Sequence, residues 1–408
     1  MTATPPARDP RLIADEPGLA GAWAGFRRRI AQGELGSLPV VVGLAVIWGI
    51  FYAANPRFLS PVNLTNLLLQ IAAMGTISAG LVLILLLGEI DLSAGVVSGL
   101  AAAVMAVLDV KLGWPAVSAL LAGLVCGAAI GAFHGIWITR LRVPSFVVTL
   151  AGLLGWQGAL LYVLGETGTL NLQDDAIPAL AGTFFAPAIG WALAAAAVVA
   201  LFAIAIVGRR RRAAAGLPLP PWRNDVASIV VRGAVLAGVA GVFSLDRGLP
   251  AAVVIFVGIV LALDTMLRRT RFGRHVFAVG GGIEAARRAG IAVDRVRVLV
   301  YALAASLAAA GGILAASRLL AVNQSSGSGD ILLSAIAAAV IGGTSLFGGR
   351  GSAWSAVLGA LVIGSISNGM DLLALASSVK FMVTGAVLLV AASIDAVSRR
   401  GRAAAGRA

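Results

Sequence analysis

The sequence is poor in the residues that build catalytic and metal sites. Its 408 residues include one cysteine, Cys126, and two histidines, His134 and His275. One cysteine cannot form a disulfide or a paired-thiol zinc site within the chain. Neither histidine has a carboxylate cluster near it in sequence, as a metal site or a catalytic triad would require. We therefore expect no enzyme activity, no bound metal and no disulfide framework.

Charged residues are also scarce. Only 12% of the residues are charged and 59% are apolar, against about 25% and about 45 to 50% in soluble domains. The 51 glycines and the Ala/Val/Leu-rich segments favour helices packed through small residues. A transmembrane barrel would show short alternating strands instead. The composition predicts an all-α, polytopic membrane protein.

Apolar runs of suitable length divide the chain into membrane spans. A span needs about 17 to 25 apolar residues, or fewer where a glycine-broken segment is buried in the bundle. This criterion predicts 10 to 12 transmembrane helices. The candidates are residues 38–54, 64–87, 95–110, 115–138, 146–164, 185–207, 228–243, 250–267, 298–320, 331–344, 353–370 and 380–394.

The basic residues orient these spans. The net charge is +13, and most arginines fall in alternate short loops with few aromatics among them. That distribution follows the positive-inside rule and argues against nucleic-acid binding. It predicts that both termini are cytoplasmic. The predicted cytoplasmic arginines are Arg27 to Arg29, Arg140, Arg142, Arg209 to Arg212, Arg223, those in 268–297 and those in 399–407.

The same pattern gives the domain organisation. Residues 37–400 form one transmembrane domain, with a basic cytoplasmic loop at 208–227, a longer one at 268–297 and a short tail at 401–408. Residues 1–36 form a cytoplasmic tail, in which Leu19, Trp23, Phe26 and Ile30 have helical spacing beside arginines. This spacing fits a helix lying along the membrane surface or a solvated linker.

A first interruption of the apolar pattern is "GEIDLSAG" at residues 88–95. It carries Glu89 and Asp91, and a carboxylate at the bilayer centre costs roughly 2.5 to 3.5 kcal/mol. Asp91 with Ser93 and Gly95 can begin a helix, with the Asp91 carboxylate accepting from free backbone N–H groups. The alternative is that Glu89 and Asp91 line a translocation path.

A second interruption is the glycine-rich stretch "IGGTSLFGGRGS" at residues 341–352. Its first glycines, Gly342 and Gly343, follow a short apolar run. Broken segments in corresponding positions of two halves indicate a substrate path. Close helix packing explains these glycines equally well.

The loop at 268–297 has an organised centre. Three glycines, Gly280 to Gly282, precede the helix-favouring run Glu284, Ala285 and Ala286, and Gly290 ends it. We predict one or two helical turns outside the bilayer. The glycine spacing of "VGGGIEA" resembles a dinucleotide fingerprint but follows no strand, and no stretch matches a phosphate-binding loop. We therefore expect no nucleotide cofactor in this chain.

At this loop the chain resembles the inner-membrane permeases of ATP-binding cassette importers. "EAARRAG" at 284–290 is similar to their Glu-Ala-Ala loop, although Gly282 and Ile283 stand where relatives often carry a polar residue. Motifs of the monosaccharide branch extend the resemblance over about residues 60 to 395. They are "GEIDLSAG", "VPSFVVTLAG" at 143–152, "FGRHVFAVGGGIEAARRAGI" at 272–291 and "AIAAAVIGGTSLFGGRGS" at 335–352.

The resemblance implies a sugar importer of the xylose or multiple-sugar type, because residues 208–248 add a segment that ribose-type relatives lack. It implies that Glu284, Ala285, Ala286 and Gly290 dock on a separate ATPase, which binds ATP and Mg²⁺. An extracytoplasmic binding protein would deliver the monosaccharide to a permease homodimer in the lipid bilayer. The spans show no obvious polar cage, so we expect a weak, wet passage. The alternatives are a branched-chain amino-acid permease and an ion-coupled secondary transporter.

Overall fold

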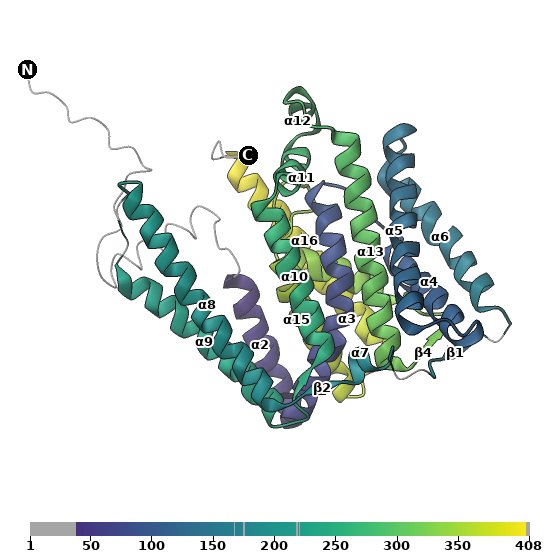
Figure 1. Cartoon of the computed structure of the whole chain (residues 1–408), viewed down its shortest axis with the longest axis horizontal. Coiled ribbons are helices and arrows are strands. Elements are labelled where there is room, and N and C mark those ends of the chain that lie inside the picture. The colour runs from purple at the N-terminus through teal and green to yellow at the C-terminus, as the bar shows by residue number, and fades with distance from the viewer. Residues whose placement is uncertain (1–37, 167, 174–175, 218, 220, 405–408) are drawn as a thin grey trace, which may run out of the picture.

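The computed structural model describes residues 38–404 apart from 167, 174–175, 218 and 220. Within them, nine helices are long and apolar enough to cross a membrane, and three shorter apolar helices lie at the other three candidate spans. The fold is therefore an all-α polytopic bundle (Figure 1). The whole predicted N-terminal tail, residues 1–36, with its candidate surface helix near residues 19–30, lies outside the described residues.

The first half of the bundle contains helices α2 (Leu38–Ala54), η2 (Pro56–Leu59), α3 (Pro61–Leu86), α4 (Ala94–Ala106), the π-helical turn η3 (Val107–Lys111), α5 (Ala116–Arg140), α6 (Ser145–Leu164), α7 (Ala179–Gly182) and α8 (Pro187–Ala214). The second half contains α9 (Trp222–Ser244), α10 (Ala251–Arg269), α11 (Arg271–Gly281), α12 (Ile283–Arg288), α13 (Val293–Leu319), α14 (Asp330–Ile341), α15 (Trp354–Leu372) and α16 (Ser377–Ala404). The last helix continues into the segment predicted as a C-terminal tail.

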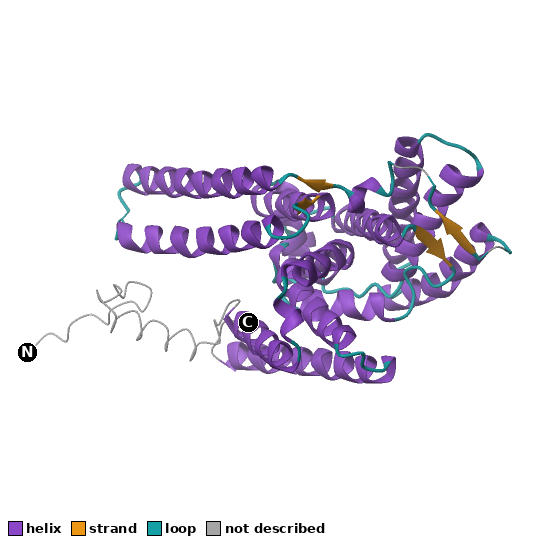
Figure 2. Cartoon of the chain, turned by 90° about the horizontal axis from the view of Figure 1, so that it is seen from below, coloured by secondary structure: helices purple, strands orange, loops and turns teal. Residues whose placement is uncertain are grey.

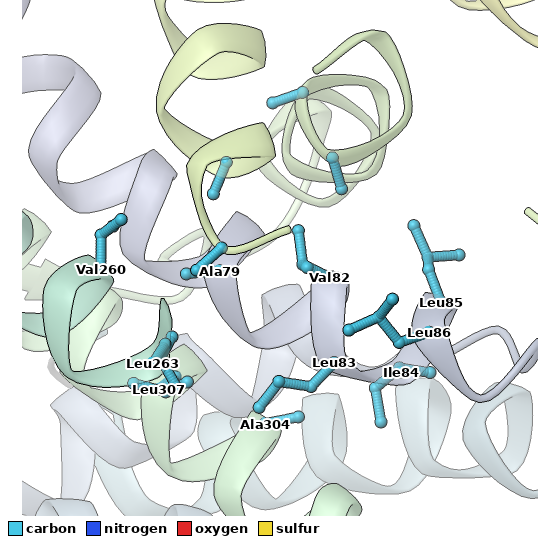
Figure 3. Packing of buried hydrophobic residues seen from close by; sticks show 14 of the residues in the cluster. Ala79, Val82, Leu83, Ile84, Leu85, Leu86, Val260, Leu263, Ala304 and Leu307 are labelled. Atoms are coloured by element: carbon cyan, nitrogen blue, oxygen red, sulfur yellow. The ribbon is translucent and has the colours of Figure 1, made fainter. Parts of the chain in front are cut away.

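Helices α3 and α13 form the centre of the bundle. In the most apolar window of α3, 83% of the residues are buried, against 6% in α8 at the periphery. Side chains of α3, α10 and α13 meet in one cluster, which includes Leu83, Val260 and Ala304 (Figure 3). Because lipid is as apolar as these side chains, close packing rather than water exclusion holds such helices together.

The two ends of the bundle differ. Two short antiparallel pairs lie at one end, β1 (Thr169–Asn171) with β4 (Ala321–Asn323) and β2 (Phe184–Phe185) with β3 (Leu249–Pro250). Helix α12 and the C-terminal part of α16 lie at the opposite end (Figure 1). This second end carries the arginine-rich segments predicted to be cytoplasmic, and we call it the cytoplasmic end.

Two helices of the bundle are short because irregular segments precede them. Residues 89–93 have no regular structure between α3 and α4, and residues 324–329 separate β4 from α14. Helix α14 has 12 residues, and its length of about 18 Å covers only part of a hydrocarbon core of about 30 Å. Irregular backbone at membrane depth is tolerated where protein buries it.

The prediction of a basic loop at residues 208–227 is largely wrong. Helix α8 continues to Ala214 and α9 begins at Trp222, so only a short connection remains. The two helices form a long hairpin beside the bundle (Figure 2). Arg209 joins their cytoplasmic ends, because its guanidinium lies 2.7 Å from the Asp225 carboxylate and over the Trp222 ring. The Ala/Arg-rich run that resembled a loop thus extends a helix.

The predicted loop at 268–297 contains more helix than expected. The predicted short helix is confirmed as α12, with Gly290 after it at a φ of +79°. The preceding residues 271–281 also form a helix, α11, whose Thr270 cap accepts from the Gly273 N–H at 3.1 Å. The chain therefore breaks at Gly282 alone and not over Gly280 to Gly282.

The packing of α14 against α15 generates a stability prediction. A Cβ at Gly359 would lie 1.6 Å from the Ala338 carbonyl oxygen, whereas a Cβ at Gly258 in α10 meets nothing within 4 Å. Gly359→Ala should therefore cost about 1 to 3 kcal/mol through overpacking. Gly258→Ala should be neutral or stabilise by up to about 1 kcal/mol. Chemical unfolding in detergent compares the two, and equal effects would refute the close crossing.

Candidate functional site

Helix α12 presents a small exposed surface at the cytoplasmic end. Its Ala286 is only 3% exposed and belongs to the main hydrophobic cluster. Glu284 and Ala285 face outward, and the Glu284 carboxylate lies 2.7 Å from the Arg287 guanidinium in an exposed ion pair. Gly282 provides no side-chain cap at the start of the helix. One buried alanine thus anchors a helix whose other side chains remain available for contact.

Glycines connect this region to the bundle through backbone contacts. A Cβ at Gly280 would lie 1.7 Å from the Leu86 carbonyl oxygen, and that oxygen accepts from the Gly349 N–H at 2.9 Å. A Cβ at Gly348 would lie 2.8 Å from the Gly88 nitrogen. We call Gly88, Gly280, Gly348 and Gly349 the glycine junction. It brings both predicted interruptions, one from each half of the chain, against the end of α11.

Glu89 forms a buried ion pair beside this junction. Its carboxylate accepts from the Arg297 Nε at 2.5 Å and from the Tyr301 hydroxyl at 2.8 Å. The two charged side chains are only 8% and 18% exposed. Both partners lie on the first turns of α13, which follows α12 in the chain. The pair therefore ties the irregular segment 89–93 to α13, the helix that follows the exposed α12 in the chain.

Asp91 lies just before α4 but does not cap this helix as predicted, because the N-cap residue is Ser93. Its Oδ1 accepts from the backbone N–H of Ser93 at 2.8 Å and from the Ser93 hydroxyl at 2.7 Å. Both residues are buried. The donor N–H belongs to the capping residue Ser93 and not to the first helical turn. Asp91 thus stabilises the turn that leads into α4, and its role in transport stays a prediction.

The three remaining predicted path residues are glycines, and two of them lie at close contacts. A Cβ at Gly95 would lie 2.5 Å from the Gly327 carbonyl oxygen, and one at Gly342 would lie 1.8 Å from the Ser355 carbonyl oxygen. Gly343 has a φ of +104° and turns the chain after α14. This geometry suits close packing and turning. A direct role of these glycines in a path stays a prediction.

A cavity of about 340 Å³ lies between α3, α4, α13, α14 and α15, and none of the ten predicted site residues lines it. Its walls carry several polar side chains that sequence reasoning missed. These are Gln70, Ser98, Arg318, Asn323, Ser325, Ser326, Asp330, Ser334 and Ser367. The available signal was Gln70, an amide within the apolar run predicted as the second span. The spans therefore do hold a polar cavity, contrary to expectation.

The remaining candidate residues are the possible metal ligands and the buried histidine, His134. Within the part of the chain that the structure describes, no group of three or more His, Cys, Asp or Glu could hold a metal ion. His134 is buried in α5 and accepts a hydrogen bond from the Trp156 indole N–H at 2.9 Å. This histidine therefore has a packing role.

Comparison with known proteins places the chain among permeases. A family model described as branched-chain amino acid transport system / permease component matches residues 63–392. The xylose transport system permease protein of Escherichia coli strain K12 is 36% identical over 89% of this chain and 93% of its own length. The xylose transport system permease protein of Haemophilus influenzae is 33% identical over 88% of this chain and 96% of its own length. The ribose import permease protein of Escherichia coli strain K12 is 31% identical over 90% of this chain and 96% of its own length. No solved structure gives a significant match.

The buried ion pair generates a second stability prediction. Arg297→Ala leaves the Glu89 carboxylate buried without its cation, which should cost about 3 to 5 kcal/mol of the free energy of unfolding. Arg287→Ala breaks the exposed pair with Glu284 and should cost about 0 to 1 kcal/mol. Chemical unfolding in detergent measures both values.

A double variant separates charge burial from simple loss of packing. Glu89→Leu combined with Arg297→Met removes both charges and should recover part of the stability lost in Arg297→Ala. If Arg297→Ala and Arg287→Ala cost the same, the Glu89–Arg297 pair is not a buried constraint.

Proposed function

The chain belongs to the family of branched-chain amino acid transport system permease components, and we propose that it is the permease subunit of an ATP-binding cassette importer for a monosaccharide. It is a multi-pass protein of the bacterial cytoplasmic membrane, as its family and its apolar helices indicate. Xylose is the first substrate to test, because the relatives at 33% and 36% identity are named as xylose permeases.

The exposed face of α12 is the single observation that carries the coupling mechanism. Glu284 and Ala285 project from the cytoplasmic end, and the buried Ala286 holds the helix to the bundle. A short helix of this kind can seat in a groove of a separate ATPase subunit, with Glu284 supplying charge and Ala285 permitting close approach. That ATPase would bind ATP and Mg²⁺ and perform the hydrolysis, while this chain has no catalytic step of its own.

Contacts between the bundle and the helices next to α12 provide a route by which a displacement of α12 can reach the membrane-spanning helices. The glycine junction joins α11 to the end of α3 without intervening side chains, and the Glu89–Arg297 pair joins α13 to the segment before α4. Backbone contacts of this kind transmit a displacement because no flexible side chain can absorb it. Transport then requires only that the ATPase binds two conformations of the permease with different affinity.

The remaining partners follow from the same proposal. An extracytoplasmic binding protein would deliver the sugar at the end that carries β1 and β4, and two copies of this chain would form the permease. In the alternative, an ion-coupled secondary transporter, Glu89 and Asp91 would need to bind a proton or cation. Their engagement by Arg297, Tyr301 and Ser93 argues against it.

Loss of the Glu284 side chain should uncouple the subunits. Glu284→Ala removes the exposed carboxylate, and we expect ATP-driven xylose uptake and co-purification of the ATPase to fall about tenfold, equivalent to about 1.4 kcal/mol of docking energy. Membrane insertion should not change, because the residue lies outside the bilayer. The measurements are uptake by cells and affinity purification from gently solubilised membranes.

Glu166→Ala provides the matched control, since Glu166 is an exposed carboxylate in the connection between α6 and β1 at the opposite end. It should leave co-purification of the ATPase unchanged, because it lies at the end away from α12. Unchanged uptake in Glu284→Ala would remove the coupling role of α12. Absence of any ATPase from the unmodified chain after crosslinking would reject the importer itself.

A further inference from the structure

We propose that the 340 Å³ cavity between α3, α4, α13, α14 and α15 is a low-affinity monosaccharide site within a single chain. This inference rests on the proposed function and specifies where the permease holds its substrate. The lining comes from residues 70–77 of α3, residues 312–319 of α13 and the segment that follows β4. Residues 312–319 end α13 directly before β4 at the β1/β4 end of the bundle (Figure 1), whereas residues 70–77 lie at the middle of α3. The cavity therefore extends from the middle of the bundle toward the end at which we propose that the sugar arrives.

Several polar side chains of the cavity make no hydrogen bond within the described part of the chain. The Gln70 amide is half-buried, Ser334 is 8% exposed and Ser367 is half-buried, and none of their side chains makes a hydrogen bond to a described residue. Because an apolar cavity can stay dry and a polar one fills, these groups hold water until a polar ligand replaces it.

The chemistry of the lining matches a neutral, hydroxyl-rich ligand. A serine hydroxyl and a glutamine amide each donate and accept hydrogen bonds, as a sugar hydroxyl does. The two charged residues of the lining, Arg318 and Asp330, have opposite signs, so the cavity does not select a net charge. Met74 and Ile363 supply apolar contact for the C–H groups of a sugar ring.

The size and composition of the cavity indicate weak binding. Its volume lies at the lower end of the roughly 300 to 1,000 Å³ of small-molecule sites. No described residue of the lining is aromatic, so the site offers no flat ring for a sugar to stack on. Weak binding suits a transporter, because a substrate held tightly at an intermediate site would leave it slowly. A dissociation constant of about 1 mM corresponds to about 4.1 kcal/mol of binding free energy.

Substrate protection of introduced cysteines tests this site. Cys126 is the only native cysteine, so Cys126→Ala gives a background in which Ser334→Cys and Ser367→Cys place one thiol on α14 or α15. Thr169→Cys, on the exposed strand β1 and outside the lining, is the matched control. The rate of modification by a small hydrophilic thiol reagent is measured in membranes containing the full chain, with about 10 mM D-xylose, D-ribose or L-leucine.

We expect xylose or ribose to slow modification at Ser334→Cys and Ser367→Cys by about tenfold if the dissociation constant is about 1 mM. Modification at Thr169→Cys should not change. Protection by L-leucine instead of sugar would overturn the assignment in favour of an amino-acid site. Equal rates with and without each ligand, or thiols that the reagent cannot reach, would overturn it as well.

A second variant links the cavity to transport. Gln70→Leu keeps the side-chain size but removes the amide, and it should raise the KM of sugar uptake several-fold while the ATPase still co-purifies. Unchanged KM would contradict the proposal. The importer and the cavity are thereby tested separately, because Glu284→Ala acts on coupling and these variants act on the sugar.

Discussion

Direct contact between backbones at the glycine junction is the constraint on which the rest of the structure depends. The Leu86 carbonyl would otherwise be an unsatisfied acceptor at the end of α3, and such groups are expensive inside a membrane protein. The Gly349 N–H satisfies it, and the missing side chain of Gly280 leaves room for α11 to approach the same oxygen. Three segments from across the chain therefore meet where no larger residue would fit, and this position fixes α11 and α12 relative to the bundle.

The buried pair of Glu89 and Arg297 solves a related problem. Residues 89–93, between α3 and α4, are not helical, so their backbone and side-chain polar groups need partners outside a helix. Asp91 satisfies Ser93 locally, while Glu89 binds Arg297 and Tyr301 of α13. Apolar residues can often replace such a pair without loss of stability, whereas removal of one partner leaves a buried charge and is costly. Here the pair fixes how the irregular segment lies against the helix that follows α12.

The two ends of the bundle carry different functional features. The cytoplasmic end holds α12 and rigid backbone contacts, whereas the end with β1 and β4 holds the polar cavity and the irregular segment before α14. Helices α3 and α13 extend from one region to the other and are the most heavily packed of the bundle. A displacement at α12 can therefore reach the cavity through two helices and without a chain of surface loops.

The sequence by itself determined the fold class, the positions of the apolar helices and the short helix at Glu284, because apolar run length, arginine placement and glycine at Gly290 are local properties. It identified both interruptions for the same reason. Only the tertiary structure decided that these interruptions touch, that Glu89 is paired with Arg297 and that Gln70 faces a cavity. Such facts depend on residues hundreds of positions apart in the chain. Helix α11 and the extension of α8 were missed because arginine-rich runs favour helices and loops alike until packing selects one.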